Sequence, residues 1–186
     1  MKKRLIDWLI CCEVIDSSEI ELYEYAIDCS IMNFVPLVSA IIIGGIFKNF
    51  LGGLLIVLPF MIVRKYSGGV HAKTRTRCFI YSGLIIAFAN IMAIKIQNDL
   101  FCSFLLCLST ISLVLLSPVE NEKKKLETFE KKVYKKRTIV WIMFFVLAYI
   151  LFLINEYTRL AICISIGVII CSIMQMVCII SKLIKG

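Results

Sequence analysis

Long apolar runs separated by short charged segments are the feature that most constrains the fold of this chain. A helix needs about 20 largely apolar residues to cross a bilayer, and six runs approach that length. Hydrophobic residues make up 60% of the sequence, whereas soluble domains seldom exceed about half. We therefore predict an all-α polytopic membrane protein with about six transmembrane helices, forming one membrane-embedded domain over residues 1–186. The expected spans are Ile31–Phe47, Phe50–Val63, Phe79–Ile96, Leu100–Leu116, Thr138–Ile154 and Leu160–Ile180.

The distribution of positive charge predicts how these spans are oriented. All of the 21 lysines and arginines except Lys48, Lys95 and Arg159 lie in the terminal segments or in the polar segments 64–78 and 117–137. By the positive-inside rule, both termini and both polar segments face the cytoplasm. The net charge of +8 is then explained by membrane orientation and contact with anionic lipid. Nucleic-acid binding is not indicated, because no nucleic-acid-binding motif accompanies the charge.

Two charged regions have more than one interpretation. The pattern of residues 1–18 predicts an amphipathic interfacial helix. The acidic residues that follow, from Glu19 to Asp28, suit either a solvated helix start or contact with a basic peptide. The basic segment 117–137 suits either a juxtamembrane anchor on anionic lipid or a landing surface for an acidic peptide. The sequence alone leaves both pairs of alternatives open.

The polar and sulfur-containing residues inside the apolar runs are expected to be structural. The nine cysteines include no CxxC pair and no Cys/His spacing typical of zinc, so neither a disulfide framework nor a metal site is indicated. No organic cofactor is implied either. Polar side chains within the runs are expected to form hydrogen bonds between helices; these are Asn90, Ser109, Ser112 and Gln175.

A candidate catalytic pair occurs in the first polar segment. His71, the only histidine, and Cys78 lie seven residues apart there. Cysteine attacks as the thiolate; an imidazole can take its proton, and nearby cations favour the anion. Lys73, Arg75 and Arg77 supply such cations. On one straight helix the pair would be about 10 Å apart, whereas direct proton transfer needs about 3 Å, so the chain must bend between them. On spacing alone, a structural role for both residues is the commoner case.

The segment resembles the accessory gene regulator B (AgrB) family, membrane cysteine endopeptidases of Gram-positive bacterial quorum sensing. The resemblance is carried by Arg64-x-x-x-Gly68-Gly69-x-His71-Ala72, with Cys78 beyond the histidine. It implies that His71 and Cys78 are catalytic and that Arg64 and Gly69 match family positions. Arg64 then has two equally weighted roles, either binding the substrate tail or oxyanion, or contacting a lipid headgroup.

The resemblance implies a single peptidase domain that matures a precursor peptide of the AgrD type. Cys78 would attack the cleavage point, release the C-terminal tail and hold the peptide as a thioester. A cysteine or serine of the peptide would then close a thiolactone or lactone ring. The expected partners are the precursor, an anionic lipid bilayer and a second copy of the chain in a homodimer, in a bacterial cell membrane. The alternative is a non-catalytic peptide exporter or scaffold, which explains the charge and topology but leaves the pairing of His71 with Cys78 as coincidence.

Overall fold

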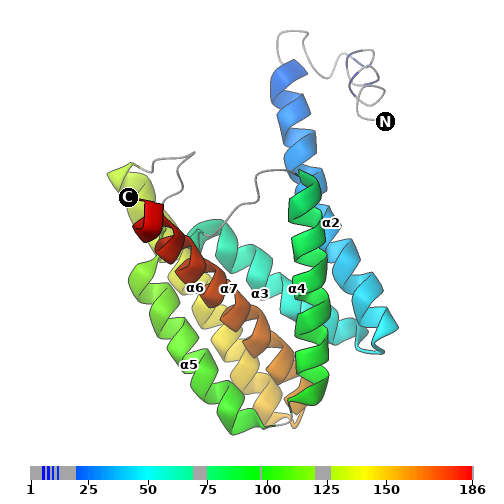
Figure 1. Ribbon diagram of the computed structural model, residues 1–186, viewed down its shortest axis with the longest axis vertical. Helices are drawn as coiled ribbons and strands as arrows, with labels where there is room; N and C mark the ends of the chain where they lie inside the picture. The colour runs from blue at the N-terminus through cyan, green and yellow to red at the C-terminus, as the bar shows by residue number, and fades with distance from the viewer. Residues whose placement is uncertain are drawn as a thin grey trace.

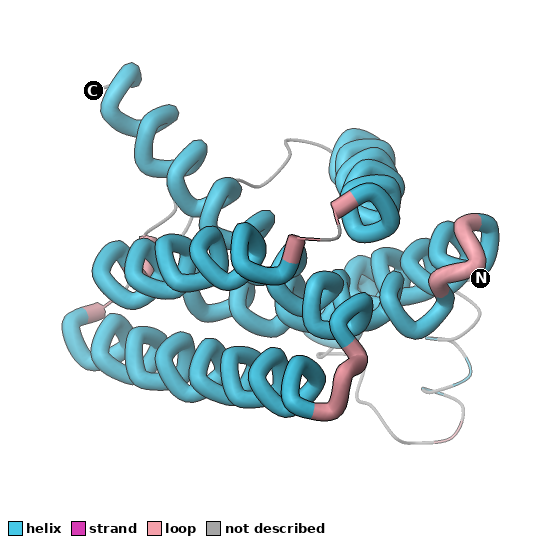
Figure 2. Tube along the Cα trace, turned by 90° about the horizontal axis from the view of Figure 1, so that it is seen from below, coloured by secondary structure: helices cyan, strands magenta, loops and turns pink. Residues whose placement is uncertain are grey.

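The regular secondary structure in the described part of the chain is all helical, as predicted. The computed structural model describes residues 6, 8, 10, 12, 20–68, 75–96, 98–119 and 127–185, and no strand occurs among them (Figures 1 and 2). The predicted interfacial helix over 1–18 lies mostly outside these residues, although Ile6, Trp8 and Ile10 are helical. The described helices are α2 (Ile20–Ile46), α3 (Phe50–Ser67), α4 (Arg75–Lys95), α5 (Asp99–Leu116), α6 (Thr128–Ile154) and α7 (Thr158–Lys185).

Each expected span lies within one of these helices or extends one residue past its end, but not all are equally long. Four helices are long and apolar enough to cross a membrane, namely α3, α5, α6 and α7. The other two contain shorter apolar stretches, Phe34–Ile46 in α2 and Phe79–Lys95 in α4. The structure therefore supports a membrane protein with four helices of spanning length, while the predicted count of six rests on the two shorter stretches.

Three helices extend into the two polar segments 64–78 and 117–137. Helix α3 continues to Ser67, α4 begins at Arg75 and α6 begins at Thr128, so much of each predicted polar segment is helical. A capping box explains the early start of α6, since the Glu127 side chain accepts from the third backbone amide of the helix and the Glu130 carboxylate accepts from the Glu127 amide at 3.3 Å. Glutamate and lysine also favour helix. Hydropathy marks where a helix becomes apolar, not where it begins.

Helices α3 and α7 form the centre of the bundle. Helix α7 packs against α3, α4, α5 and α6, while α2 and α4 lie against each other and against α3 at one edge (Figure 1). Gly167 of α7 permits the closest approach, because a Cβ there would lie 2.3 Å from the Ile56 carbonyl oxygen of α3. Burial of apolar side chains between these helices supplies the core. The buried residues of its largest cluster are Phe60, Val63, Leu106, Leu113, Ile142, Phe145, Tyr149, Ala161, Ile164, Val168 and Cys171.

The helix ends that border the candidate catalytic segment gather at one end of the bundle. The ends of α3, α5 and α7 and the starts of α4 and α6 lie there, whereas short turns join α2 to α3, α4 to α5 and α6 to α7 at the opposite end (Figure 1). The described ends of the two basic segments therefore lie at one end of the bundle, and the predicted cytoplasmic orientation of that end stays a prediction.

Candidate functional site

The candidate catalytic segment runs from the last turns of α3 to the first turn of α4. Arg64 lies in α3, and Cys78 lies in the first turn of α4 together with Arg75 and Arg77, all three of these placed by their backbone only. The remaining predicted residues, Gly69, His71 and Lys73, lie outside the described residues. The described part of α4 starts at Arg75, and the path of the chain from His71 to it lies outside the described residues.

The exit of the chain from α3 is fixed by contacts with the residues that follow α5. The Val119 amide donates to the Ser67 carbonyl oxygen at 2.9 Å. Gly68 comes next, with φ of +83°, and a Cβ there would lie 2.3 Å from the Val119 carbonyl oxygen. Only glycine adopts such a conformation readily and leaves room for this approach. The backbone just before His71 is therefore held against the backbone just after α5.

A buried polar cluster surrounds this exit. Gln175 of α7 donates through Nε2 to the Ser67 carbonyl oxygen at 3.5 Å and to the Ser117 hydroxyl at 3.4 Å. The Ser67 hydroxyl lies 3.6 Å from the Cys171 sulfur. Ser67 and Gln175 are fully buried, and Ser117 is nearly so. The side chains of α7 thus connect the end of α3 to the end of α5 inside an otherwise apolar bundle.

These contacts test the expectation of interhelical hydrogen bonds. It is confirmed for Gln175 and for Asn90, whose Oδ1 accepts from Asn49 Nδ2 at 3.4 Å. It is wrong for Ser112, whose buried hydroxyl has no hydrogen-bond partner among the described residues. Ser67 and Ser117 lie at the ends of apolar runs and were not identified from the sequence, because a lone serine at a helix end has no distinctive pattern.

Aromatic and cationic side chains bring the two basic segments together. The rings of Tyr66 in α3 and Tyr134 in α6 are 5.9 Å apart. The guanidinium carbon of Arg137 lies 5.6 Å from the Tyr66 ring centre, and the Lys65 ammonium lies 5.9 Å from it. Such contacts are cation–π interactions. Arg137 of α6 is therefore placed beside the exit of α3, which the sequence order of the two segments does not reveal.

Arg64 lies near the same end of α3, and its side chain packs toward the core. Its guanidinium carbon is 5.0 Å from the Phe60 ring centre, and its carbonyl oxygen accepts from the Gly68 amide at 3.1 Å. Because Phe60 belongs to the largest buried cluster, packing holds the Arg64 side chain close to the bundle. Neither of its two predicted roles is tested by these contacts.

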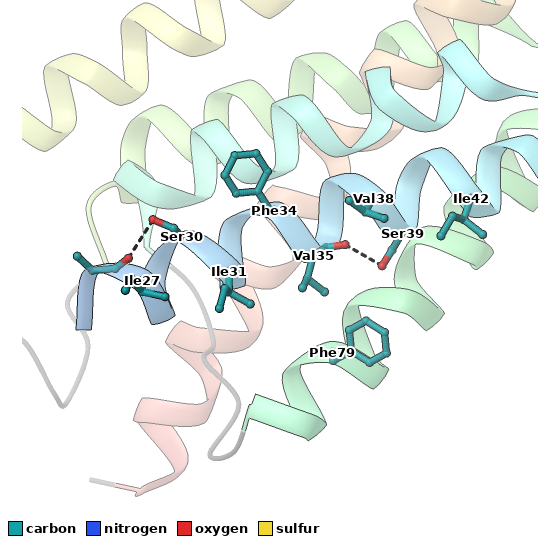
Figure 3. Close-up of a pocket in the computed structure, with 10 residues that line it drawn as sticks. Ile27, Ser30, Ile31, Phe34, Val35, Val38, Ser39, Ile42 and Phe79 are labelled. Atoms are coloured by element: carbon teal, nitrogen blue, oxygen red, sulfur yellow. Dashed lines mark hydrogen bonds between the residues drawn. The ribbon is translucent and has the colours of Figure 1, made fainter. Parts of the chain in front are cut away.

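An apolar groove lies between α2 and α4, beside the first turn of α4. It has a volume of about 580 Å³ and is bordered by Phe79, the residue after Cys78, which points from α4 toward α2 (Figure 3). Its two hydroxyls are bonded within α2, from Ser30 to the Ala26 carbonyl at 2.9 Å and from Ser39 to the Val35 carbonyl at 2.8 Å. The groove thus presents an apolar surface one residue from the candidate nucleophile.

Comparisons with known proteins point to one family. The family model described as accessory gene regulator B matches residues 2–179. An accessory gene regulator protein B of Staphylococcus intermedius is 32% identical over 94 residues, 49% of this chain and 49% of the relative. One of Staphylococcus aureus (strain bovine RF122 / ET3-1) is 32% identical over 125 residues, 66% of this chain and 64% of the relative. The matches thus span about half to two thirds of these relatives. No solved structure matches the chain.

Proposed function

This chain belongs to the accessory gene regulator B (AgrB) family, and we propose that it is a membrane cysteine endopeptidase of a quorum-sensing system. The observation that carries the proposal is the position of Cys78. It lies in the first turn of α4, within the segment covered by the family model. Cysteine attacks as the thiolate, and Arg75 and Arg77 lie in the same turn and would favour that anion.

The proposed reaction cleaves a peptide bond of an AgrD-like precursor and keeps the released acyl group activated as a thioester on Cys78. The Cys78 sulfur attacks the carbonyl at the cleavage point, the S–C bond forms, and the C–N bond breaks. The C-terminal tail leaves as an amine that receives a proton from His71, which had taken the thiol proton. A cysteine or serine of the bound peptide then displaces Cys78 and closes a thiolactone or lactone ring. Water must be restricted, since hydrolysis would waste the thioester.

The structure supports a substrate that is partly apolar and partly acidic. The groove beside Phe79 is apolar, while Arg137 and Lys65 flank Tyr66 at the exit of α3. An acidic tail would be attracted by such a cationic surface. We place this surface, both termini and the catalytic segment on the cytoplasmic side. Arg64, Gly69, Lys73, Arg75 and Arg77 are the proposed substrate or oxyanion contacts, and a homodimer on anionic lipid is the proposed assembly.

Co-expression with the precursor peptide tests the function directly. Intact-mass measurement should show tail loss with the wild-type chain and with Cys107→Ala, a control that removes an exposed cysteine of α5. Neither Cys78→Ala nor His71→Ala should release the tail, at equal abundance in the membrane. A precursor lacking its ring-forming cysteine or serine should accumulate as a thioester on Cys78 that hydroxylamine releases. Unchanged processing by Cys78→Ala would refute the peptidase mechanism and favour a non-catalytic scaffold.

A further inference from the structure

The side chain of Gln175 is unusual for a residue in the middle of an apolar helix. It is fully buried, and its Nε2 donates both to the Ser67 carbonyl oxygen and to the Ser117 hydroxyl. Its Oε1 is buried and has no hydrogen-bond partner among the described residues. The amide nitrogen of Gln175 is therefore hydrogen-bonded, whereas the amide oxygen is not bonded to any described residue.

Packing alone does not explain a glutamine at this position. Buried polar groups are normally paired, and each exception calls for a reason. A methionine or leucine would fill the same volume without burying an unpaired oxygen. The neighbouring residues that face the same core are apolar or weakly polar, such as Cys171 and Met174. What distinguishes glutamine here is its amide donor and the two oxygens that the donor reaches.

Both oxygens lie where the chain leaves a helix at the end of the bundle that carries the candidate site. Ser67 is the last residue of α3 and precedes His71 by four positions, while Ser117 is the first residue after α5. The Ser67 carbonyl oxygen also accepts from the Val119 amide. It is thus held from two directions, by α7 through Gln175 and by the segment after α5 through Val119.

We infer that Gln175 is a positioning residue for the proposed peptidase reaction. By holding the Ser67 carbonyl oxygen it fixes the end of α3 and the direction in which the backbone leaves it at Gly68, and by holding Ser117 it fixes the start of the segment that Gly68 packs against. It acts through the backbone and does not touch the reacting atoms. This inference rests on the proposed function, because the segment it positions contains the proposed general base.

The test compares tail cleavage by purified, vesicle-reconstituted chains acting on a synthetic precursor peptide. The variants are Gln175→Met, which keeps volume and removes the donor, Ser117→Ala, and the double variant. Met176→Leu is the matched control, since Met176 is the next residue along α7 and is exposed on the outside of the bundle. Alkylation of Cys78, located by peptide mass spectrometry, gives a second readout. His71→Ala shows how much of that reactivity depends on the histidine.

A positioning role predicts that Gln175→Met lowers kcat by about tenfold to a hundredfold, the scale of a small misplacement of catalytic groups. KM and the melting temperature should stay near the wild-type values. Alkylation of Cys78 in Gln175→Met should fall toward the His71→Ala rate. The effects of Gln175→Met and Ser117→Ala should be non-additive, because the two side chains share one hydrogen bond.

Three results would overturn the inference, each in a different way. Cleavage that is lost in Cys78→Ala but equal in Gln175→Met and Met176→Leu would remove the positioning role and leave the proposed function standing. Cleavage that persists in Cys78→Ala would overturn the proposed function and the role of Gln175 with it. A fall in melting temperature that matches the loss of activity in Gln175→Met would assign the residue a purely structural role.

Discussion

The Val119 amide nitrogen lies 2.9 Å from the Ser67 carbonyl oxygen and donates a hydrogen bond to it. Because Ser67 ends α3 and Val119 follows α5, this bond joins two helices that are not consecutive in the chain. It also joins the starts of the two polar segments that the sequence predicted to be cytoplasmic. Changes that separate these two backbones should therefore affect both folding and the proposed site.

Gly68→Ala should separate them. The substitution would place a Cβ 2.3 Å from the Val119 carbonyl oxygen, at a residue whose φ is +83°. A non-glycine residue held in such a backbone region costs about 1–3 kcal/mol, and the clash with backbone adds to it. We expect a lower melting temperature in detergent, followed by tryptophan fluorescence, and slower tail cleavage.

Gly83→Ala is the matched control for this prediction. Gly83 lies inside α4, and a Cβ there would meet nothing within 4 Å. Alanine in a helix interior is about 0.5–1 kcal/mol more favourable than glycine, so the melting temperature should rise slightly. If Gly68→Ala and Gly83→Ala had the same melting temperature, the close approach of Gly68 to Val119 would not contribute to stability.

Gly167→Ala tests the central contact between α3 and α7. The added Cβ would lie 2.3 Å from the Ile56 carbonyl oxygen, a backbone atom that cannot rotate away. Overpacking of this kind costs about 1–3 kcal/mol, so the fraction folded in a denaturing-detergent titration should fall. Gly45→Ala in α2, with open space around its Cβ, should leave the titration nearly unchanged. Equal stability of Gly167→Ala and Gly45→Ala would contradict the close contact of α7 with α3 at Gly167 and Ile56.

The fold was largely predictable because hydropathy is strongest where a helix is buried in lipid or protein. Each apolar run lies in a helix, and both polar segments emerge at one end of the bundle. The helix starts were less predictable, since Arg75 and Thr128 begin helices in charged sequence. At Thr128 the start follows local capping by Glu127 and Glu130 and not hydropathy.

The candidate site was predictable only where residues combine within a short motif. His71 and Cys78 were identified by their types and spacing and by resemblance to a family, and their relative placement stays a prediction. The contact of Ser67 with Val119 and Gln175 joins residues far apart in the sequence. Nothing in a single sequence indicates that pairing. The only available indication was a glutamine inside an apolar run.

Tyr66 should couple the basic start of α6 to the exit of α3. Its ring centre lies 5.9 Å from that of Tyr134 and 5.6 Å from the guanidinium carbon of Arg137. Tyr66→Leu removes both ring contacts and should cost about 1–2 kcal/mol, since an aromatic pair and an exposed cation–π contact each contribute about 0.5–1 kcal/mol or slightly more. Tyr66→Phe keeps the ring and should retain the stability. Thermal unfolding distinguishes the two, and a Phe variant as unstable as the Leu variant would show that the hydroxyl, not the ring, matters.

Gln175→Met and Asn90→Leu should change stability in different ways, although each removes a buried amide. Asn90 uses both ends of its side chain, since Nδ2 donates to the Ile86 carbonyl oxygen at 2.9 Å and Oδ1 accepts from Asn49. Asn90→Leu therefore leaves Asn49 Nδ2 with only the Cys163 sulfur, a weak acceptor at 3.7 Å, and should lower the free energy of unfolding by about 1–3 kcal/mol.

Gln175→Met loses two hydrogen bonds of 3.4 and 3.5 Å but also removes the unpaired Oε1 from the interior. The Ser67 carbonyl oxygen keeps its bond from Val119. These effects oppose each other, so the free energy of unfolding should stay within about 1 kcal/mol of the wild-type value. Denaturing-detergent titration of both variants checks the contrast. A loss for Gln175→Met as large as that for Asn90→Leu would mean that the glutamine is kept for stability, and the reason to assign it a positioning role would disappear.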